Sequence, residues 1–189
     1  MAEHLPLDQQ DPADGAEPQQ PHPHCTDARQ RIIVDRQIVE DVWQLVNDDQ
    51  IPASGPVIVP LKVWLAQRAQ LLARGEVGVW IAPDEEVEDL AQDVARLPLI
   101  AVDFPAFTDG RGFSTARLLR DRYGFKGQLR AVGDVFKDTM LYLHRCGFNA
   151  YAVRPDKDIV EAARGLDDFH EFYQGAVDQP LPLFRRRST

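Results

Sequence analysis

The sequence is poor in cysteine, in long apolar runs and in positive charge. Two cysteines in 189 residues cannot form a disulfide framework, so a reducing cytoplasm is the expected location. No apolar run approaches the about 20 residues that span a bilayer, and the first residues lack the basic and apolar regions of a secretory signal. The net charge of −9 argues against binding to nucleic acid. We therefore expect a cytoplasmic protein of one domain that contacts neither membrane nor nucleic acid.

The two ends of the chain differ in composition from its centre. Residues 1–30 are rich in proline, glutamine and aspartate and poor in apolar side chains, which predicts a disordered tail. Two histidines and a cysteine in this tail make an incomplete metal site, so we expect no bound metal. A single α/β domain is expected over residues 31–175, followed by a flexible tail over residues 176–189.

Hydrophobic patterning predicts an N-terminal β-hairpin over residues 31–43 and a helix over residues 59–75. Four βα units follow. Their strands are expected at 77–83, 97–104, 127–133 and 149–155, and their helices at 85–97, 114–124, 135–147 and 157–173. Continuous apolar strands alternating with helices predict a mainly parallel sheet covered by helices, as a half-barrel or an open sheet. In either architecture ligands bind beyond the carboxyl ends of the strands.

Charge is distributed unevenly along the chain. Residues 99–155 carry five acidic and nine basic side chains, a balance of +4, whereas every other segment is acidic. Such asymmetry points to a site for an anionic ligand or partner. The alternative is that these basic side chains lie on solvated helix faces.

The loop after the second strand of the βα series combines glycines, an aspartate and an arginine and leads into a helix. Its backbone N–H groups and Arg111 suit an oxyanion or a phosphate, with Arg130 and Arg154 adding charge. In the alternative, Asp109 caps backbone groups, the glycines turn the chain, and Arg111 pairs with Asp109 or Asp103. Asp134 either caps the next helix or orients a ligand. The candidate ligand-binding residues are Asp109, Gly110, Arg111, Gly112, Ser114, Arg117, Arg130, Asp134 and Arg154.

No residue is assigned a catalytic role and no cofactor is assigned. The string GRGFST (110–115) is a poor match to a dinucleotide-binding fingerprint, because the loop is too long and Thr115 replaces the last small residue. The sequence has no motif for a flavin, haem or an iron–sulfur cluster, so any cofactor would lack a known fingerprint or belong to a partner. Cys146 falls on the apolar side of its expected helix, which predicts a buried and unreactive thiol.

The run FTDGRGFSTARLLRDRYGFKGQLRAVGDVFKDTMLYLHRCGFNAYAV (107–153) closely resembles the bacterial domain of unknown function 934 family. The resemblance covers roughly residues 30–173 and contains the candidate positions Asp109 to Asp134. Members of that family are often labelled probable oxidoreductases of sulfite reduction and are commonly encoded beside the haemoprotein subunit of assimilatory sulfite reductase. The oxidoreductase activity rests on this resemblance alone.

Two functions follow as expectations. The first is an accessory protein or oxidoreductase of assimilatory sulfite or sulfate reduction, which binds a small oxyanion or a phosphorylated ligand at the strand ends. The second is a non-catalytic interaction module that docks onto sulfite reductase or its electron donor. Completion of a barrel by a second copy is a third possibility, and it would make the protein a homo-oligomer.

Overall fold

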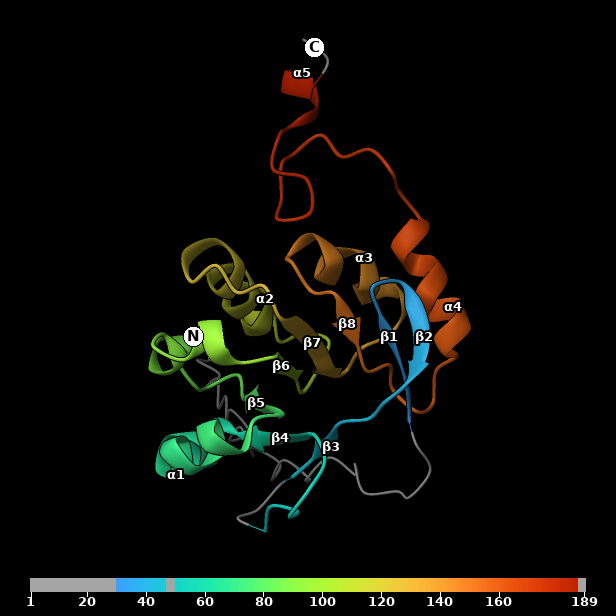
Figure 1. The fold of residues 1–189 in the computed structure, drawn as a ribbon. Coiled ribbons are helices and arrows are strands. Elements are labelled where there is room, and N and C mark those ends of the chain that lie inside the picture. The colour runs from blue at the N-terminus through green and yellow to red at the C-terminus, as the bar shows by residue number, and fades with distance from the viewer. Residues whose placement is uncertain (1–29, 47–49, 187–189) are drawn as a thin grey trace, which may run out of the picture.

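An eight-stranded sheet organises the chain. The computed structural model describes residues 30–46 and 50–186, in which five α-helices accompany a sheet curled into a half-barrel (Figure 1). The strands are β1 (Arg31–Val34), β2 (Gln37–Glu40), β3 (Gln44–Leu45), β4 (Val57–Pro60), β5 (Val77–Ile81), β6 (Leu99–Phe104), β7 (Gln128–Gly133) and β8 (Ala150–Tyr151). The helices are α1 (Leu61–Arg74), α2 (Arg111–Arg117), α3 (Lys137–Arg145), α4 (Ile159–Arg164) and α5 (Leu183–Arg186).

The strand order is β2-β1-β8-β7-β6-β5-β4-β3, and the sheet is mixed. Strands β3 to β8 run parallel to one another, whereas β1 pairs antiparallel with both β2 and β8. The prediction of a mainly parallel sheet is corrected here, because the N-terminal hairpin joins the sheet through antiparallel pairs. Of the two predicted architectures, the half-barrel is the one found.

The predicted hairpin is confirmed. Its turn consists of Asp35 and Arg36, whose φ values of 46° and 67° suit the two-residue turn that matches the twist of antiparallel strands. Ile33 then pairs with Tyr151, which places the hairpin at the β8 edge.

The four predicted strands of the βα series are confirmed as β5 to β8, although β8 is only two residues long. The sequence-based prediction missed β4 because its apolar run leads directly into α1. Pro60 holds extended backbone, with φ −57° and ψ 149°, and the helix begins at the next residue. A two-residue strand, β3, was also missed; it pairs with β4.

The predicted helix over residues 85–97 is wrong. Two 3₁₀ turns occupy this stretch, Val87–Leu90 and Val94–Arg96. The apolar side chains of the stretch are buried as expected, since a 3₁₀ turn also brings residues i and i+3 to one side. Between the turns the buried carboxylate of Asp93 accepts hydrogen bonds from Trp64 Nε1 at 3.1 Å and from an Arg68 guanidinium nitrogen at 2.7 Å. These hydrogen bonds to α1 stabilise the two 3₁₀ turns in place of an α-helix.

Two other predicted helices have different bounds. The helix expected over 114–124 begins earlier, as α2, and continues as a π-helical turn over Leu118–Arg122. The helix expected over 157–173 ends early, because α4 is followed only by the 3₁₀ turn Gly165–Asp167. Beyond that turn, the chain has irregular structure up to α5.

The two faces of the sheet have different coverings. Side chains such as Val79, Ile100 and Leu129 share one large hydrophobic cluster with the helices. On the opposite, inner face, Ile58 and Leu99 belong to a separate smaller cluster. Aromatic and aliphatic side chains of that cluster include Trp43, Leu45, Trp80 and Val132.

Residues 41–43, called the strap below, connect β2 to β3. These two strands form the opposite edges of the sheet, so three residues join one edge of the half-barrel to the other. Trp43 of the strap packs against the inner cluster. The strap therefore covers the inner face and limits how far the sheet can open.

Candidate functional site

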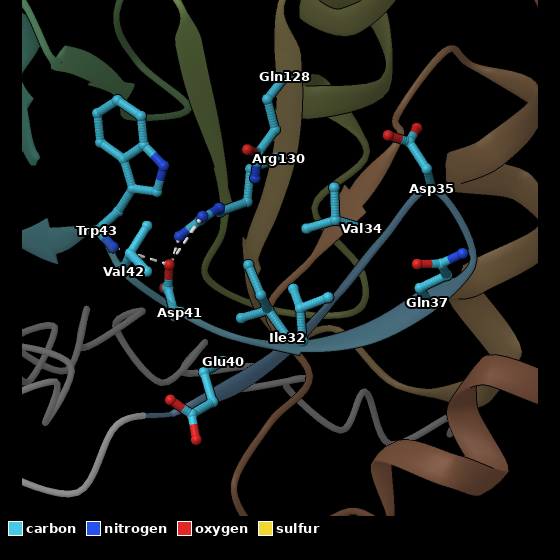
Figure 2. Close-up of a pocket in the computed structure, with 11 residues that line it drawn as sticks. Ile32, Val34, Asp35, Gln37, Glu40, Asp41, Val42, Trp43, Gln128 and Arg130 are labelled. Atoms are coloured by element: carbon cyan, nitrogen blue, oxygen red, sulfur yellow. Dashed lines mark hydrogen bonds and ion pairs between the residues drawn. The ribbon is translucent and has the colours of Figure 1, made fainter.

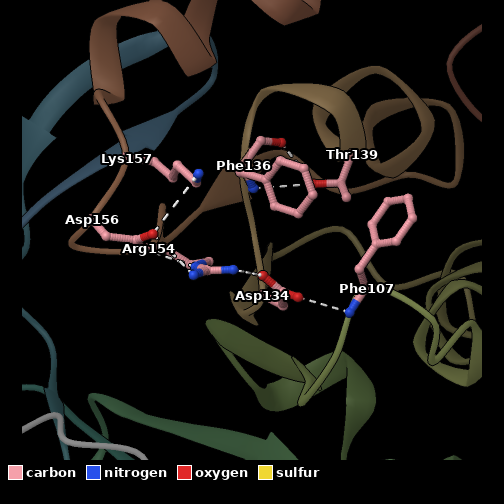
Figure 3. A network of polar contacts seen from close by, with 7 residues as sticks. All are labelled: Phe107, Asp134, Phe136, Thr139, Arg154, Asp156 and Lys157. Atoms are coloured by element: carbon pink, nitrogen blue, oxygen red, sulfur yellow. Dashed lines mark hydrogen bonds and ion pairs between the residues drawn. The ribbon is translucent and has the colours of Figure 1, made fainter.

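A polar network joins three loops at the carboxyl ends of β6, β7 and β8 (Figure 3). Asp134, directly after β7, accepts a hydrogen bond from the backbone N–H of Phe107 at 2.8 Å. Its other carboxylate oxygen accepts from Arg154, after β8, at 2.5 Å. Arg154 also binds Asp156 through two nitrogens, each at 2.9 Å. We call this region the rim; Asp134 is its centre.

Asp134 does not cap the helix that follows it. The helix α3 begins at Lys137, and Thr139 takes the capping role: its hydroxyl accepts from Phe136 N at 3.2 Å and donates to Phe136 O at 2.8 Å. The capping alternative for Asp134 is therefore wrong. Its carboxylate instead links neighbouring loops, which is consistent with a role in ordering the rim.

The loop before α2 is closed by its own ion pair. Asp109 accepts from the backbone N and Nε of Arg111 at 3.1 and 3.0 Å, and from a terminal guanidinium nitrogen at 2.6 Å. These bonds lower the pKa of Asp109 below its usual value. The alternative in which Asp109 pairs with Arg111 is confirmed. The Arg111 side chain is 60% exposed, so the pair lies at the surface.

The remaining residues of the expected loop site pack against the protein, lie exposed at the surface or form an ion pair. Gly112 lies against the ring of Phe104, where an added Cβ would come within 2.7 Å of a ring carbon. Gly110 immediately precedes α2 and is exposed, as is Ser114 within the helix. Arg117 forms an exposed ion pair with Asp121 one turn further on.

Arg130 lies on the inner face of the sheet, away from the helices. Its side chain is 3% exposed, and two of its guanidinium nitrogens donate to Asp41 of the strap at 2.7 and 3.0 Å (Figure 2). A cavity of about 370 Å³ opens beside this pair, between the hairpin, the strap and β7. Asp35, Glu40 and Asp41 also line the cavity, so its charge disfavours an oxyanion.

The structure therefore brings together some of the candidates and separates others. Asp134 and Arg154 meet at the rim, and the loop that contains Asp109 and Arg111 reaches the same network through the backbone of Phe107. Arg130 faces a different surface, so the expected convergence of three arginines is not found.

All seven arginines between residues 99 and 155 bind protein groups. Four of them, Arg111, Arg117, Arg130 and Arg154, form the ion pairs described above. Arg122 pairs with Glu88 at 3.6 Å, Arg145 pairs with Asp178 at 3.5 Å, and Arg120 donates to backbone carbonyls. The basic segment thus interacts with acidic parts of the same chain, and its charge is largely neutralised.

Sequence reasoning missed Phe107 and Asp41 in this region, and it considered Asp103 only as a partner for Arg111. Asp103, near the end of β6, is buried, and its carboxylate lies 2.8 Å from where a Cβ would stand on Gly133 of the neighbouring strand. An aspartate inside the apolar run LIAVDF was the available signal. Phe107 is exposed beside the Phe136 ring, with ring centroids 5.5 Å apart. Asp41, the partner of Arg130, had no signal in its local sequence.

Cys146 is buried, so that part of the prediction is confirmed, and burial raises the pKa of its thiol, which favours the less reactive protonated form. Within residues 30–46 and 50–186, no three His, Cys, Asp or Glu side chains are grouped so as to hold a metal ion. The histidines and cysteine of the N-terminal segment lie outside the described residues, as does the predicted disordered tail. No helix in the described part of the chain is long and apolar enough to cross a membrane.

The fold and the rim define an α/β protein with a curled mixed sheet and an ion-paired network at its strand ends. Residues 78–184 match the family model described as "Bacterial protein of unknown function (DUF934)". Because the match spans more than half of the chain, the protein belongs to this family, as its resemblance indicated. No curated protein and no solved structure matches the chain.

Proposed function

We propose that this protein is a non-catalytic accessory protein of assimilatory sulfite reduction, which docks onto sulfite reductase or onto its electron donor. The observation that carries the proposal is the state of the arginines. Each arginine expected to bind an oxyanion is already engaged by a carboxylate of its own chain, and Arg130 is sealed from solvent as well. Because the rim has no uncompensated positive charge, it is better suited to binding a protein surface than to binding a small dianion.

The composition of the rim supports docking. Phe107 is exposed between loops that also present Arg111 and Arg154, and aromatic residues and arginine are the types enriched at protein interfaces. The bonds of Asp134 to Phe107 and Arg154 fix these loops before a partner binds. Such prior order reduces the entropy lost on association.

The docking proposal is tested by calorimetric titration with the isolated haemoprotein subunit of the reductase and, separately, with its electron donor. We expect wild-type protein to bind one of them with a dissociation constant on the order of 1–100 µM, as transient complexes do. Phe107→Ser is expected to weaken binding about tenfold, because it removes an exposed aromatic anchor. If wild-type protein binds neither titrant, the docking proposal is wrong.

A second candidate function, oxyanion binding at the rim, is favoured by the exposure of two ion pairs. Asp109–Arg111 and Arg154–Asp156 are both surface pairs of residues two apart. Surface pairs contribute only about 0–1 kcal/mol each, so a sulfite dianion could displace the aspartate and take its place.

Thermal unfolding in the presence of sulfite tests this second candidate. Under oxyanion binding, sulfite at about 100 times its dissociation constant stabilises the protein by about 2.7 kcal/mol, which raises Tm by about 5–10 °C. Arg111→Ala should abolish the shift, since it removes the bidentate group. Sodium chloride at matched ionic strength is the control. An equal shift in the wild type and in Arg111→Ala would exclude this loop as the sulfite site.

A further inference from the structure

The C-terminal part of the chain, residues 168–186, presents apolar side chains to solvent. We call this segment the arm. It carries four of the large hydrophobic residues that are more than half exposed, namely Phe169, Tyr173, Leu181 and Phe184. In Figure 1 the arm rises from α4, and α5 stands clear of the sheet and of the other helices.

The arm is held in place by one arginine of α3. The guanidinium of Arg145 lies over the ring of Phe172, 3.8 Å from its centroid, donates to Gln174 O at 2.7 Å and pairs with Asp178. The backbone N of Val177 donates to the carbonyl of Arg145 at 3.1 Å. Four contacts with a single residue fix the base of the arm to the folded domain.

The outer part of the arm is fixed by its own contacts. Leu183 N donates to Tyr173 O at 3.2 Å, and Arg186 donates to Phe172 O at 3.2 Å and pairs with Glu171 at 3.0 Å. The rings of Tyr173 and Phe184 lie 6.5 Å apart. The exposed aromatic side chains therefore project from an ordered backbone, which lowers the entropy lost when a partner binds them.

The arm lies at the end of the sheet opposite the rim. Helix α3 starts beside the rim residue Phe136 and ends at Arg145, just before β8 begins, so its last turn stands at the amino ends of the strands. The arm is attached to that turn. It is thus a surface separate from Phe107 and Arg154.

Charge indicates what kind of surface covers the arm. From Gln179 to Arg186 the arm contains two arginines and no acidic residue, so its tip is basic. The complementary surface is acidic. A second copy of this chain, with its net charge of −9, and an anionic lipid surface present negative charge as well, so the test below includes both of them.

We propose that the arm is the apolar anchor by which this protein docks onto an acidic protein surface with a hydrophobic recess. Tyr173 and Phe184 fill the recess, and Arg185 meets carboxylates at its edge. The inference rests on the proposed docking function and adds a second contact with the partner, separate from the rim. Large exposed aromatic side chains with arginine beside them are the residues that dominate binding at protein interfaces.

The test compares full-length variants in the calorimetric titration described above. The double variant Tyr173→Ser/Phe184→Ser is expected to bind at least about tenfold more weakly than wild type, and Arg185→Glu to weaken binding and its dependence on salt. The matched control is Leu65→Ser, which removes an exposed apolar side chain from α1. It should bind as wild type does. Because the arm residues are exposed, Tm should stay unchanged in all variants.

The outcomes separate this inference from the function on which it rests. If the arm variants bind as tightly as wild type, the arm is not part of the interface, and the docking function still stands. If wild-type protein binds neither titrant, both the docking function and the inference about the arm are wrong. Arm-dependent dimerisation in sedimentation equilibrium, or arm-dependent binding to anionic phospholipid vesicles, would also overturn the inference and identify a second copy or a membrane surface instead.

Discussion

Replacing Arg130 by methionine is expected to lower the free energy of unfolding by about 3–5 kcal/mol, because the carboxylate of Asp41 then stays in the interior without its partner. The Arg130 side chain is 3% exposed and that of Asp41 is 13% exposed, so water cannot replace the lost bonds fully. For a chain of this length the loss corresponds to a decrease in Tm of about 6–20 °C. Thermal unfolding followed by circular dichroism measures it.

Two further variants identify the cause of that loss. Asp41→Leu together with Arg130→Met should recover most of the stability, since an apolar pair replaces a buried ion pair at little cost. Arg117→Met is the matched control: it breaks the exposed pair with Asp121 and should cost less than about 1 kcal/mol. If Arg130→Met proves no worse than Arg117→Met, the strap is not fixed by this ion pair.

Substituting Gly133 by alanine is expected to destabilise the protein by more than about 3 kcal/mol. The residue has a φ of +90°, and a Cβ there would lie 2.3 Å from the carbonyl oxygen of Phe104. It would also lie 2.8 Å from the carboxylate of Asp103. The same Phe104 oxygen accepts from Asp134 N at 2.6 Å. The methyl group must therefore separate β6 from β7 where the rim network begins.

Gly124→Ala separates backbone strain from the steric clash. Gly124 has a φ of +63° with nothing within 4 Å of an added Cβ, so its substitution should cost only about 1–2 kcal/mol. Urea unfolding of the two variants gives the difference. If the two variants lose equal free energy of unfolding, the close contact with Phe104 is relieved without destabilising the protein, and the rim tolerates a wider gap between β6 and β7.

Patterns within a few residues predicted most of the fold, and contacts between distant residues account for the errors. The hairpin and strands β5 to β7 were predicted correctly because buried apolar runs and turn residues are local signals. The stretch 85–97 was predicted as a helix because an apolar spacing of three and four residues fits both α and 3₁₀ structure. The deciding contact, Asp93 with Trp64 and Arg68, spans more than 20 residues of sequence.

The rule that sites lie at strand ends selected Asp134 and Arg154, and the two do meet, because parallel strands bring the residues that follow them to one edge of the sheet. It failed for Arg130, which stands inside β7 between Leu129 and Ala131. Those two neighbours pack toward the helices, so the alternation of side chains along a strand already directs Arg130 to the opposite face. That signal was present in the sequence.

The positive charge balance of residues 99–155 was expected to mark a site for an anionic ligand or partner, but most of its basic side chains pair with acidic residues of the same chain. Pairs such as Arg130–Asp41, Arg122–Glu88 and Arg145–Asp178 join this segment to acidic residues on both sides of it in sequence. Net charge along a chain does not reveal which residues are neighbours in space. Here a basic centre and acidic flanks attract one another and help the chain to close on itself.

The position of the N-terminal hairpin determines the order in which the chain can assemble during synthesis. β1 and β2 leave the ribosome before the other strands of the sheet, yet β1 pairs with β8. The partner of Asp41, Arg130, is synthesised 89 residues later. Nascent chains that end before Tyr151 therefore have a hairpin without a neighbouring strand and a carboxylate without a cation. Folding is completed only after translation has passed β8, and the unfinished sheet is the species that chaperones must protect from aggregation.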